Sequence, residues 1–127
     1  ADVKVASNSL GLFLKILKEK NIPLTLDISH LAMGRYDIPR IVHEARTLIR
    51  QVHLSDFRDD IEHLPLGYGT LPYEELLQRF DPSWNIVLEF DFCTPERRAA
   101  LGNPGKKDLK VLLARQKEIL RNNGKKV

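Results

Sequence analysis

The chain has little of several residue types, and each shortage excludes a class of protein. Cys93 is the only cysteine among 127 residues, so no disulfide can form within the chain, and a reducing compartment is expected. No apolar run approaches the about 20 residues that cross a bilayer, and no basic segment followed by an apolar one opens the sequence. We therefore predict a cytoplasmic protein with no membrane partner.

Charge of one sign is also scarce. The 20 lysines and arginines stand against 17 acidic residues, which leaves a net charge of +3, and much of the excess follows Arg97. An imbalance this small does not by itself indicate a nucleic-acid partner. The remaining composition, with 43% hydrophobic and 29% charged residues, is typical of a globular protein. We therefore predict that residues 1–127 belong to one domain.

The hydrophobic periodicity alternates along the chain between that of helices and that of strands. Helices are predicted over residues 9–20, 36–50, 72–80 and 106–123, and strands over residues 22–29, 51–56 and 85–92. The last strand is almost continuously apolar, which is typical of a strand buried on both faces. Strands that alternate with helices pair in parallel through right-handed crossovers, so the predicted fold class is α/β.

Polar side chains capable of binding metal or moving protons follow each predicted strand. Asp27 and His30 follow the first strand, His53 and Asp56 belong to the second, and Glu89 lies in the third. The carboxyl ends of parallel strands lie at the same edge of a sheet, where α/β enzymes place their catalytic groups. We therefore predict that Asp27, His53 and Glu89 share one ion, with ligand atoms about 4 to 5 Å apart.

One imidazole with two carboxylates suits a divalent ion of intermediate hardness, such as Mn, Co, Mg or Zn. Such an ion polarises a sugar carbonyl or hydroxyl, and Glu89 beside it can move the proton on the neighbouring carbon. If His30 and His63 also face the metal, more of the ligand atoms are nitrogens, and such a set favours zinc. A zinc site favours activation of water for attack on a phosphodiester.

The stretch from His53 to Gly69 combines these candidates with an acidic middle. His63 is open to two interpretations, as a ligand or as an ordinary loop residue. Asp56, Asp59 and Asp60 are typical of a solvated acidic turn, although Asp56 stays a candidate for a further contact with metal or substrate. Gly67 and Gly69 indicate a tight loop that needs positive φ angles or close backbone approach.

Several motifs in order resemble the xylose isomerase-like TIM barrels, which include endonuclease IV, sugar-phosphate isomerases and ketose 3-epimerases. "LTLDISH" resembles the sixth strand of that barrel, "VHLSD" with "HLPLGYG" the seventh strand and its loop, and "IVLEF" the eighth. The resemblance covers residues 9–89 and, less specifically, the closing helix. It implies a partial (β/α)8 barrel, with about three C-terminal βα units and the preceding helix.

The resemblance also implies roles for individual residues. Asp27 and His53 resemble metal ligands of the family, and Glu89 resembles a ligand that also abstracts a proton in epimerases. His30 resembles a histidine that contacts substrate in epimerases and binds zinc in endonuclease IV. His63 resembles the histidine that helps to hold the third zinc of endonuclease IV.

The sequence departs from the family pattern at three places. Endonuclease IV has an aspartate two residues before the last of these histidines, where this chain has Ile61. Epimerases use an arginine for substrate oxygens where this chain has Asp59, although Arg58 is adjacent. The fifth-strand glutamate ligand of the family would fall just before the resemblance begins, and residues 1–9 contain no glutamate.

The predicted activity is that of a metal-dependent sugar or sugar-phosphate isomerase or epimerase, of which this chain is the C-terminal part. One alternative is an endonuclease IV-like zinc phosphodiesterase acting on abasic DNA, and another is a non-catalytic binding or assembly module. A complete barrel needs about 250 residues. We therefore expect the remaining half of the barrel, or a second copy, to cover the open sheet edges, and the chain alone to be inactive and to bind metal weakly.

The same expectation extends to the face of the sheet that would line the barrel. Without the other strands, we expect an apolar patch on that face. The residues expected to be partly exposed there are Leu24, Leu26, Val52, Leu54, Val87 and Leu88.

Overall fold

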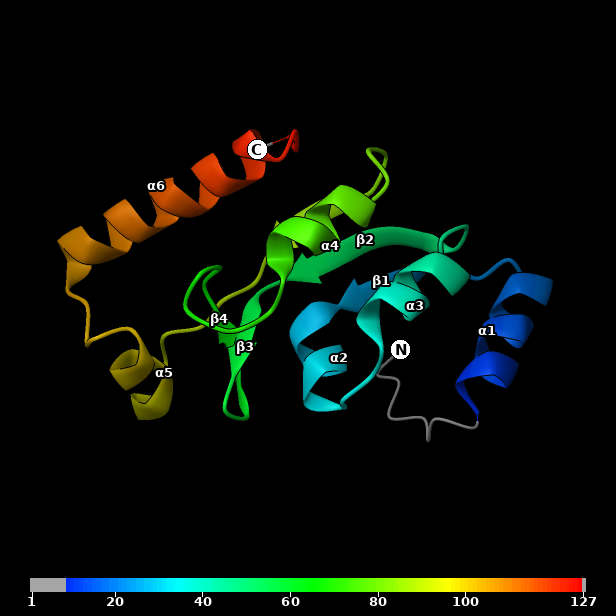
Figure 1. Cartoon of the computed structure of the whole chain (residues 1–127), viewed down its shortest axis with the longest axis horizontal. Coiled ribbons are helices and arrows are strands. Elements are labelled where there is room, and N and C mark those ends of the chain that lie inside the picture. The colour runs from blue at the N-terminus through cyan, green and yellow to red at the C-terminus, as the bar shows by residue number, and fades with distance from the viewer. Residues whose placement is uncertain (1–8, 127) are drawn as a thin grey trace.

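The computed structural model describes residues 9–126, so residues 1–8, just upstream of the resemblance, lie outside the described part. The helices are α1 (Leu10–Glu19), α2 (Ile28–Met33), α3 (Ile38–Glu44), α4 (Tyr73–Arg79), α5 (Pro95–Ala100) and α6 (Lys106–Asn122). The strands are β1 (Leu24–Asp27), β2 (Ile49–Leu54), β3 (Asp56–Arg58), β4 (Ile61–Leu64) and β5 (Asn85–Leu88). Figure 1 shows their arrangement.

The main sheet has the order β1-β2-β5, and both strand pairs are parallel. This confirms the α/β class and the predicted parallel pairing. Across residues 9–126 the sheet is open and does not close into a barrel. None of the helices in this part of the chain combines the length and the apolar character needed to cross a membrane.

Several predicted boundaries are wrong. The strand predicted over residues 85–92 ends at Leu88. The strand predicted over residues 22–29 ends at Asp27, whose side-chain Oδ1 accepts a hydrogen bond from the His30 backbone N–H and caps α2. The predicted helix over residues 36–50 ends at Glu44, because Ile49 pairs with Leu24 at the start of β2. Tertiary pairing overrides the helical periodicity there.

The acidic middle of the stretch from His53 to Gly69 forms an antiparallel hairpin, β3 with β4, rather than an irregular loop. Asp59 and Asp60 connect the two strands, and both have positive φ angles, of 50° and 59°. A two-residue connection with both φ angles positive matches the right-handed twist of a hairpin, and aspartate tolerates this conformation. Asp59 and Asp60 are therefore the hairpin turn.

The prediction that Asp56 belongs to a solvated turn is wrong, because Asp56 is completely buried. Its carboxylate accepts hydrogen bonds from the backbone N–H groups of Phe57, Gly67, Gly69 and Leu71, at 2.9 to 3.0 Å. Gly67 has a φ of 93°, and a Cβ atom on Gly69 would overlap the Asp56 carboxylate. The expected backbone roles of both glycines are thus confirmed, and Asp56 closes the loop after β4.

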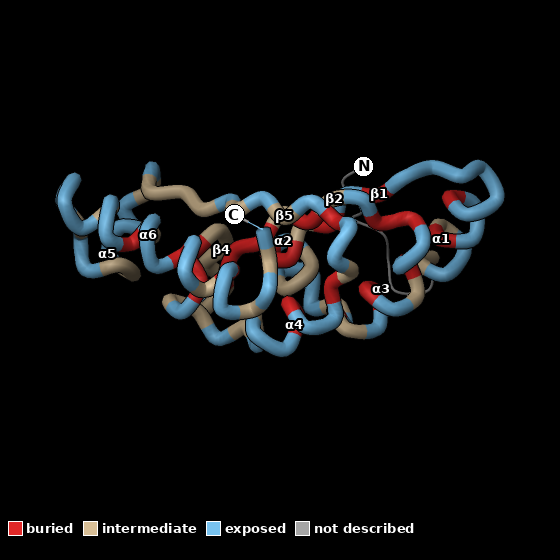
Figure 2. The backbone as a smooth tube through the Cα atoms, turned by 90° about the horizontal axis from the view of Figure 1, so that it is seen from above, coloured by how far each residue is buried: buried red, intermediate tan, exposed pale blue. Residues whose placement is uncertain are grey.

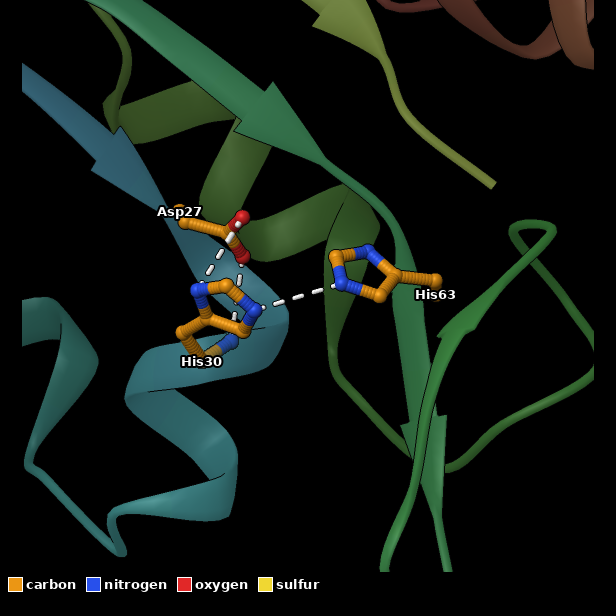
Figure 3. Close-up of side chains that lie close together, drawn as sticks. All are labelled: Asp27, His30 and His63. Atoms are coloured by element: carbon orange, nitrogen blue, oxygen red, sulfur yellow. Dashed lines mark hydrogen bonds and ion pairs between the residues drawn. The ribbon is translucent and has the colours of Figure 1, made fainter. Parts of the chain in front are cut away.

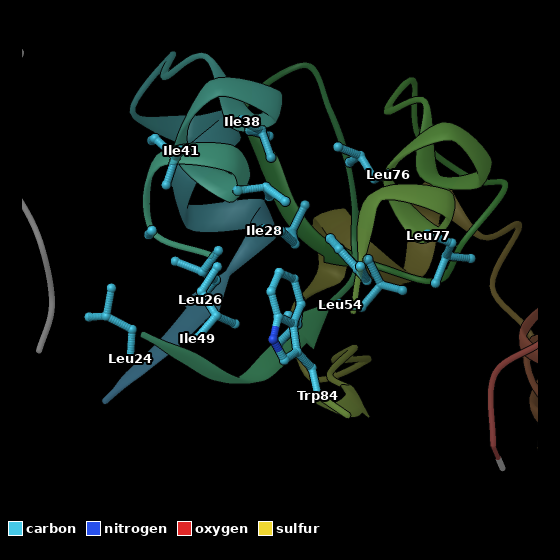
Figure 4. Packing of buried hydrophobic residues seen from close by; sticks show 14 of the residues in the cluster. Leu24, Leu26, Ile28, Ile38, Ile41, Ile49, Leu54, Leu76, Leu77 and Trp84 are labelled. Atoms are coloured by element: carbon cyan, nitrogen blue, oxygen red, sulfur yellow. The ribbon is translucent and has the colours of Figure 1, made fainter. Parts of the chain in front are cut away.

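The helices α3 and α4 cover one face of the main sheet, as Figure 2 shows. Buried side chains of both helices pack there on buried side chains of the strands (Figure 4). The labelled members of this core are Leu24, Leu26, Ile28, Ile38, Ile41, Ile49, Leu54, Leu76, Leu77 and Trp84. Their burial supplies the main stabilisation of the fold.

The predicted apolar patch on the opposite face is largely wrong. The register of the strands turns four of the six residues toward the helices, so that they are buried: Leu24, Leu26, Val52 and Leu54. Val87 is 41% exposed and Leu88 is half-buried. The edge strand β5 is therefore not buried on both faces. Most side chains on the open face are polar, and they include Thr25, Gln51, Asn85 and His53.

The helix α6 is anchored by a buried amide. The Gln116 side chain donates to the Leu66 carbonyl oxygen at 3.1 Å and accepts from the Leu66 N–H at 2.7 Å. Gln116 is completely buried, so both of its polar groups need these partners. The contact joins α6 to the same loop that Asp56 closes.

We expect Asp56→Asn to lower the free energy of unfolding by about 2 to 3 kcal/mol, because the amide removes the charge and presents a donor to buried N–H groups. Denaturant unfolding measures this change. Asp60→Asn is the matched control, because Asp60 is exposed in the turn and asparagine tolerates a positive φ, so a change within about 0.5 kcal/mol is expected. Equal stabilities of the two variants would contradict the role of Asp56.

Candidate functional site

The structure brings Asp27, His53 and Glu89 together at the carboxyl ends of β1, β2 and β5. Asp27 pairs with His53 across the sheet, and the Glu89 N–H donates to the Leu54 carbonyl oxygen at 3.1 Å, which continues the β5 pairing. Each of the three side chains offers one ligand atom, and these atoms lie within 4.8 Å of one another. The predicted proximity is confirmed, and the role as metal ligands stays a prediction.

His53 has a partner at each ring nitrogen. Its Nδ1 lies 2.6 Å from Glu89 Oε2, and its Nε2 lies 2.8 Å from Gln51 Nε2. A carboxylate accepts hydrogen bonds and does not donate them, so Nδ1 carries a proton toward Glu89. A divalent cation bound at Nδ1 would displace this proton, because a nitrogen that binds a metal cannot also carry a proton.

A second group of possible ligands shares Asp27 with the first and adds His30 and His63, as Figure 3 shows. His30 Nδ1 lies 3.4 Å from Asp27 Oδ2, and the Nε2 atoms of the two histidines lie 3.2 Å apart. His30 and His63 therefore lie at the same edge of the sheet as the first group, with Asp27 common to both groups. Two histidines and a carboxylate form a donor set richer in nitrogen than the first.

His63 has an unusual backbone conformation for a strand residue, with a φ of 58°. Its Nδ1 lies 3.4 Å from Ser29 Oγ, which in turn donates to Asp27 Oδ1 at 3.1 Å. A non-glycine residue in the left-handed region costs on the order of 1 kcal/mol and is typical of functional sites. We infer that surrounding contacts hold His63 in this conformation.

Glu62 lies beside the second group, next to both of its histidines, and the sequence reasoning missed it. Its Oε2 lies 3.5 Å from His30 Nε2, and its Oε1 lies 3.9 Å from His63 Nε2. Neighbouring residues of a regular strand point to opposite faces, so Glu62 and His63 were not expected together. The left-handed backbone of His63 breaks this alternation, and no sequence signal other than adjacency could have indicated it.

The other two candidate residues lie elsewhere. Asp56 uses its carboxylate oxygens on loop N–H groups, so its role is structural. Arg58 Nε lies 3.7 Å from Asp59 Oδ2 at the hairpin turn, where the Asp59 side chain is 85% exposed. A surface pair of this kind contributes little to stability.

A cavity of about 300 Å³ adjoins the site along β1. Asp27, His30, His53 and Glu89 form its polar part. Its apolar lining comes from α1, β1 and the segment around α2 and α3, and includes Phe13, Leu14, Leu26, Leu31, Tyr36 and Ile41. The size lies at the lower end of the range for small-molecule pockets.

Arg97 fixes Glu62 from outside the site. Its Nε donates to the Glu62 carbonyl oxygen at 2.9 Å, its Nη2 lies 3.6 Å from Glu62 Oε1, and its Nη1 lies 2.6 Å from Asp91 Oδ2. The pKa of Asp91 lies below its usual value, mainly because the backbone N–H and the thiol of Cys93 donate to it. Asp91 in turn raises the pKa of the exposed Cys93 thiol, first through that hydrogen bond and then through its charge.

Comparisons of the chain with family models, curated proteins and solved structures find no match. The resemblance to the xylose isomerase-like barrels therefore rests on the motifs named above.

We expect Asp91→Asn to make Cys93 react at least about twofold faster with iodoacetamide at pH 8, because loss of the neighbouring negative charge lowers the thiol pKa and increases the thiolate fraction. Mass spectrometry measures the rate on this single cysteine. Glu96→Gln is the control, since it removes an exposed acidic charge nearby. An unchanged rate in Asp91→Asn would show that Asp91 does not govern the thiol.

Proposed function

We propose that the chain is the C-terminal part of a xylose isomerase-like TIM barrel that acts as a metal-dependent sugar or sugar-phosphate isomerase or epimerase. The observation that carries the proposal is the meeting of Asp27, His53 and Glu89 at the carboxyl ends of adjacent parallel strands. Sequential parallel strands with helices on one face also agree with βα units of a barrel.

The donor set fits a divalent ion. Two carboxylates and one imidazole suit Mn, Co, Mg or Zn, and Asp27, His53 and Glu89 would hold it. The bound ion supplies Lewis-acid polarisation of a substrate carbonyl or hydroxyl. Glu89, whose side chain is 46% exposed, is available to take a proton from the carbon next to that carbonyl.

The cavity supports a small-molecule substrate. Its volume of about 300 Å³ suits a sugar or a sugar phosphate better than a polymer, and its polar lining includes Asp27, His53 and Glu89, the residues that would hold the ion. His30 lines the cavity beside Asp27 and is placed to contact substrate oxygens. The apolar lining excludes water from one side of the ligand.

A second candidate function is an endonuclease IV-like zinc phosphodiesterase that acts on abasic DNA. The observation that favours it is the second group of His30, His63 and Asp27, with Glu62 close to both histidines. Ile61 stands where endonuclease IV has an aspartate, and Glu62, the next residue, supplies a carboxylate instead. A shared Asp27 between two donor sets is suited to two zinc ions, which in such enzymes activate water and stabilise the leaving oxygen.

The two outer edges of the sheet also need a partner under this proposal. The outer edges of β1 and β5 have no strand beside them among residues 9–126. Unpaired strand edges invite association. We propose that the remaining strands of the barrel, or a second copy of the chain, cover them. A purely structural role as a binding or assembly module is the alternative in which no metal is bound.

We expect the intact protein to bind Mn²⁺, and Asp27→Asn to weaken this binding by more than the about 10- to 100-fold that loss of an outer-shell partner costs. Asparagine caps a helix as well as aspartate does, so α2 is retained and only the charge is lost. Isothermal titration measures the affinity. Asp37→Asn is the matched control, because Asp37 also caps a helix, α3, and belongs to neither group of candidate ligands. Equal effects of both substitutions would contradict the ligand role.

Metal stoichiometry and substrate separate the two candidate enzymes. For the isomerase or epimerase we expect one ion per site and incorporation of solvent deuterium at the carbon next to the sugar carbonyl. His30→Ala or His63→Ala should then lower the catalytic activity strongly and the melting temperature only slightly. Two or three zinc ions per site, together with cleavage of abasic DNA, would establish the phosphodiesterase instead. Full activity in both histidine variants would return them to a structural role.

A further inference from the structure

Gln51 lies on the open face of β2, two residues before His53, and touches the first group of candidate ligands from outside. Its Nε2 atom lies 2.8 Å from His53 Nε2, and the opposite ring nitrogen of His53 lies 2.6 Å from Glu89 Oε2. Gln51 is half-buried and pairs in register with Thr25 on one side and Asn85 on the other. Because β2 is the central strand, the neighbouring strands on both sides limit the positions that the Gln51 amide can reach.

The hydrogen bonds define one tautomer of His53 in this arrangement. Glu89 only accepts, so the Nδ1 nitrogen is the protonated one. The Nε2 nitrogen then has a lone pair, and the Gln51 amide N–H donates to it. Donor and acceptor alternate consistently from Gln51 through the imidazole to Glu89.

A cation that takes the place of the Nδ1 proton reverses the requirement at the other nitrogen. The Nε2 nitrogen must then carry the proton, and it needs an acceptor. A glutamine amide provides one without moving the backbone, because rotation of its terminal group exchanges N–H for C=O. Lysine could only donate at this place, and glutamate in its ionised form could only accept.

We propose that Gln51 is the positioning residue that sets the tautomer of His53: it donates to Nε2 in the cation-free site and accepts from Nε2 when His53 binds a cation through Nδ1. The cation-bound half of this inference rests on the proposed function, and the cation-free half does not. Gln51 acts through His53 and is not itself a ligand.

The cation-bound half is tested with Zn²⁺ affinity, measured by competition with a chromogenic chelator. Gln51→Met, which removes donor and acceptor but keeps the length, should bind Zn²⁺ about 10- to 100-fold more weakly. Gln51→Glu, which retains the acceptor, should restore the affinity. Asn85→Asp is the matched control, because it adds a negative charge in the same row of the sheet without an acceptor for His53. The gain in affinity from wild type to Asn85→Asp should be smaller than the gain from Gln51→Met to Gln51→Glu.

Nitrogen NMR of the histidine rings tests the cation-free half and separates this inference from the proposed function. In metal-free protein, the His53 Nε2 signal should be that of an unprotonated nitrogen accepting a hydrogen bond, and Gln51→Met should shift it. With Zn²⁺, Nε2 should carry a proton. Zn²⁺ binding that Gln51→Met leaves unchanged would overturn the positioning role while the proposed function stands. No Zn²⁺ binding by the intact wild-type protein would overturn the proposed function and the acceptor role of Gln51. A metal-free Nε2 signal that Gln51→Met does not shift would overturn its donor role.

Discussion

The register of the parallel strands decides where every residue of the first group lies. Asp27 pairs with His53, and β5 is aligned so that Glu89 follows at the same edge. Because side chains alternate between the two faces of a strand, a slip of one residue would turn His53 into the core. The polar open face and the apolar covered face therefore come from one alignment.

An irregularity near the start of β2 makes this alignment compatible with the core. Leu24 pairs with Ile49, but the next residue, Thr25, pairs with Gln51, so Arg50 is passed over. Ile49 and Val52 can then both face the helices although they are three positions apart. Without the extra residue, either Ile49 or the row of Gln51 and His53 would lie on the wrong face. The candidate site thus depends on a bulge at the opposite end of the strand.

The second group depends in a different way on the β3–β4 hairpin and on the loop after β4. Asp56 holds the segment from Gly67 to Leu71 by buried hydrogen bonds, and this segment follows the hairpin that carries Glu62 and His63. Arg97 holds the same hairpin from α5. His63 itself accepts a hydrogen bond at its carbonyl oxygen from the Asp91 N–H at 3.1 Å, and its ring lies beside Ser29 Oγ and His30 Nε2. The buried Asp56 carboxylate, which belongs to neither group, thereby supports the hairpin that carries the candidate ligand His63.

The sequence by itself determined the α/β class, the parallel sheet, and the convergence of Asp27, His53 and Glu89. These follow from local periodicity and from the rule that parallel strands place their carboxyl ends at one edge. Only the tertiary structure decided the burial of Asp56, the exposed face of β5 and the position of Glu62. Each of these depends on contacts between residues distant in sequence, or on a backbone angle at His63 that breaks the regular alternation, and local patterns carry no information about either.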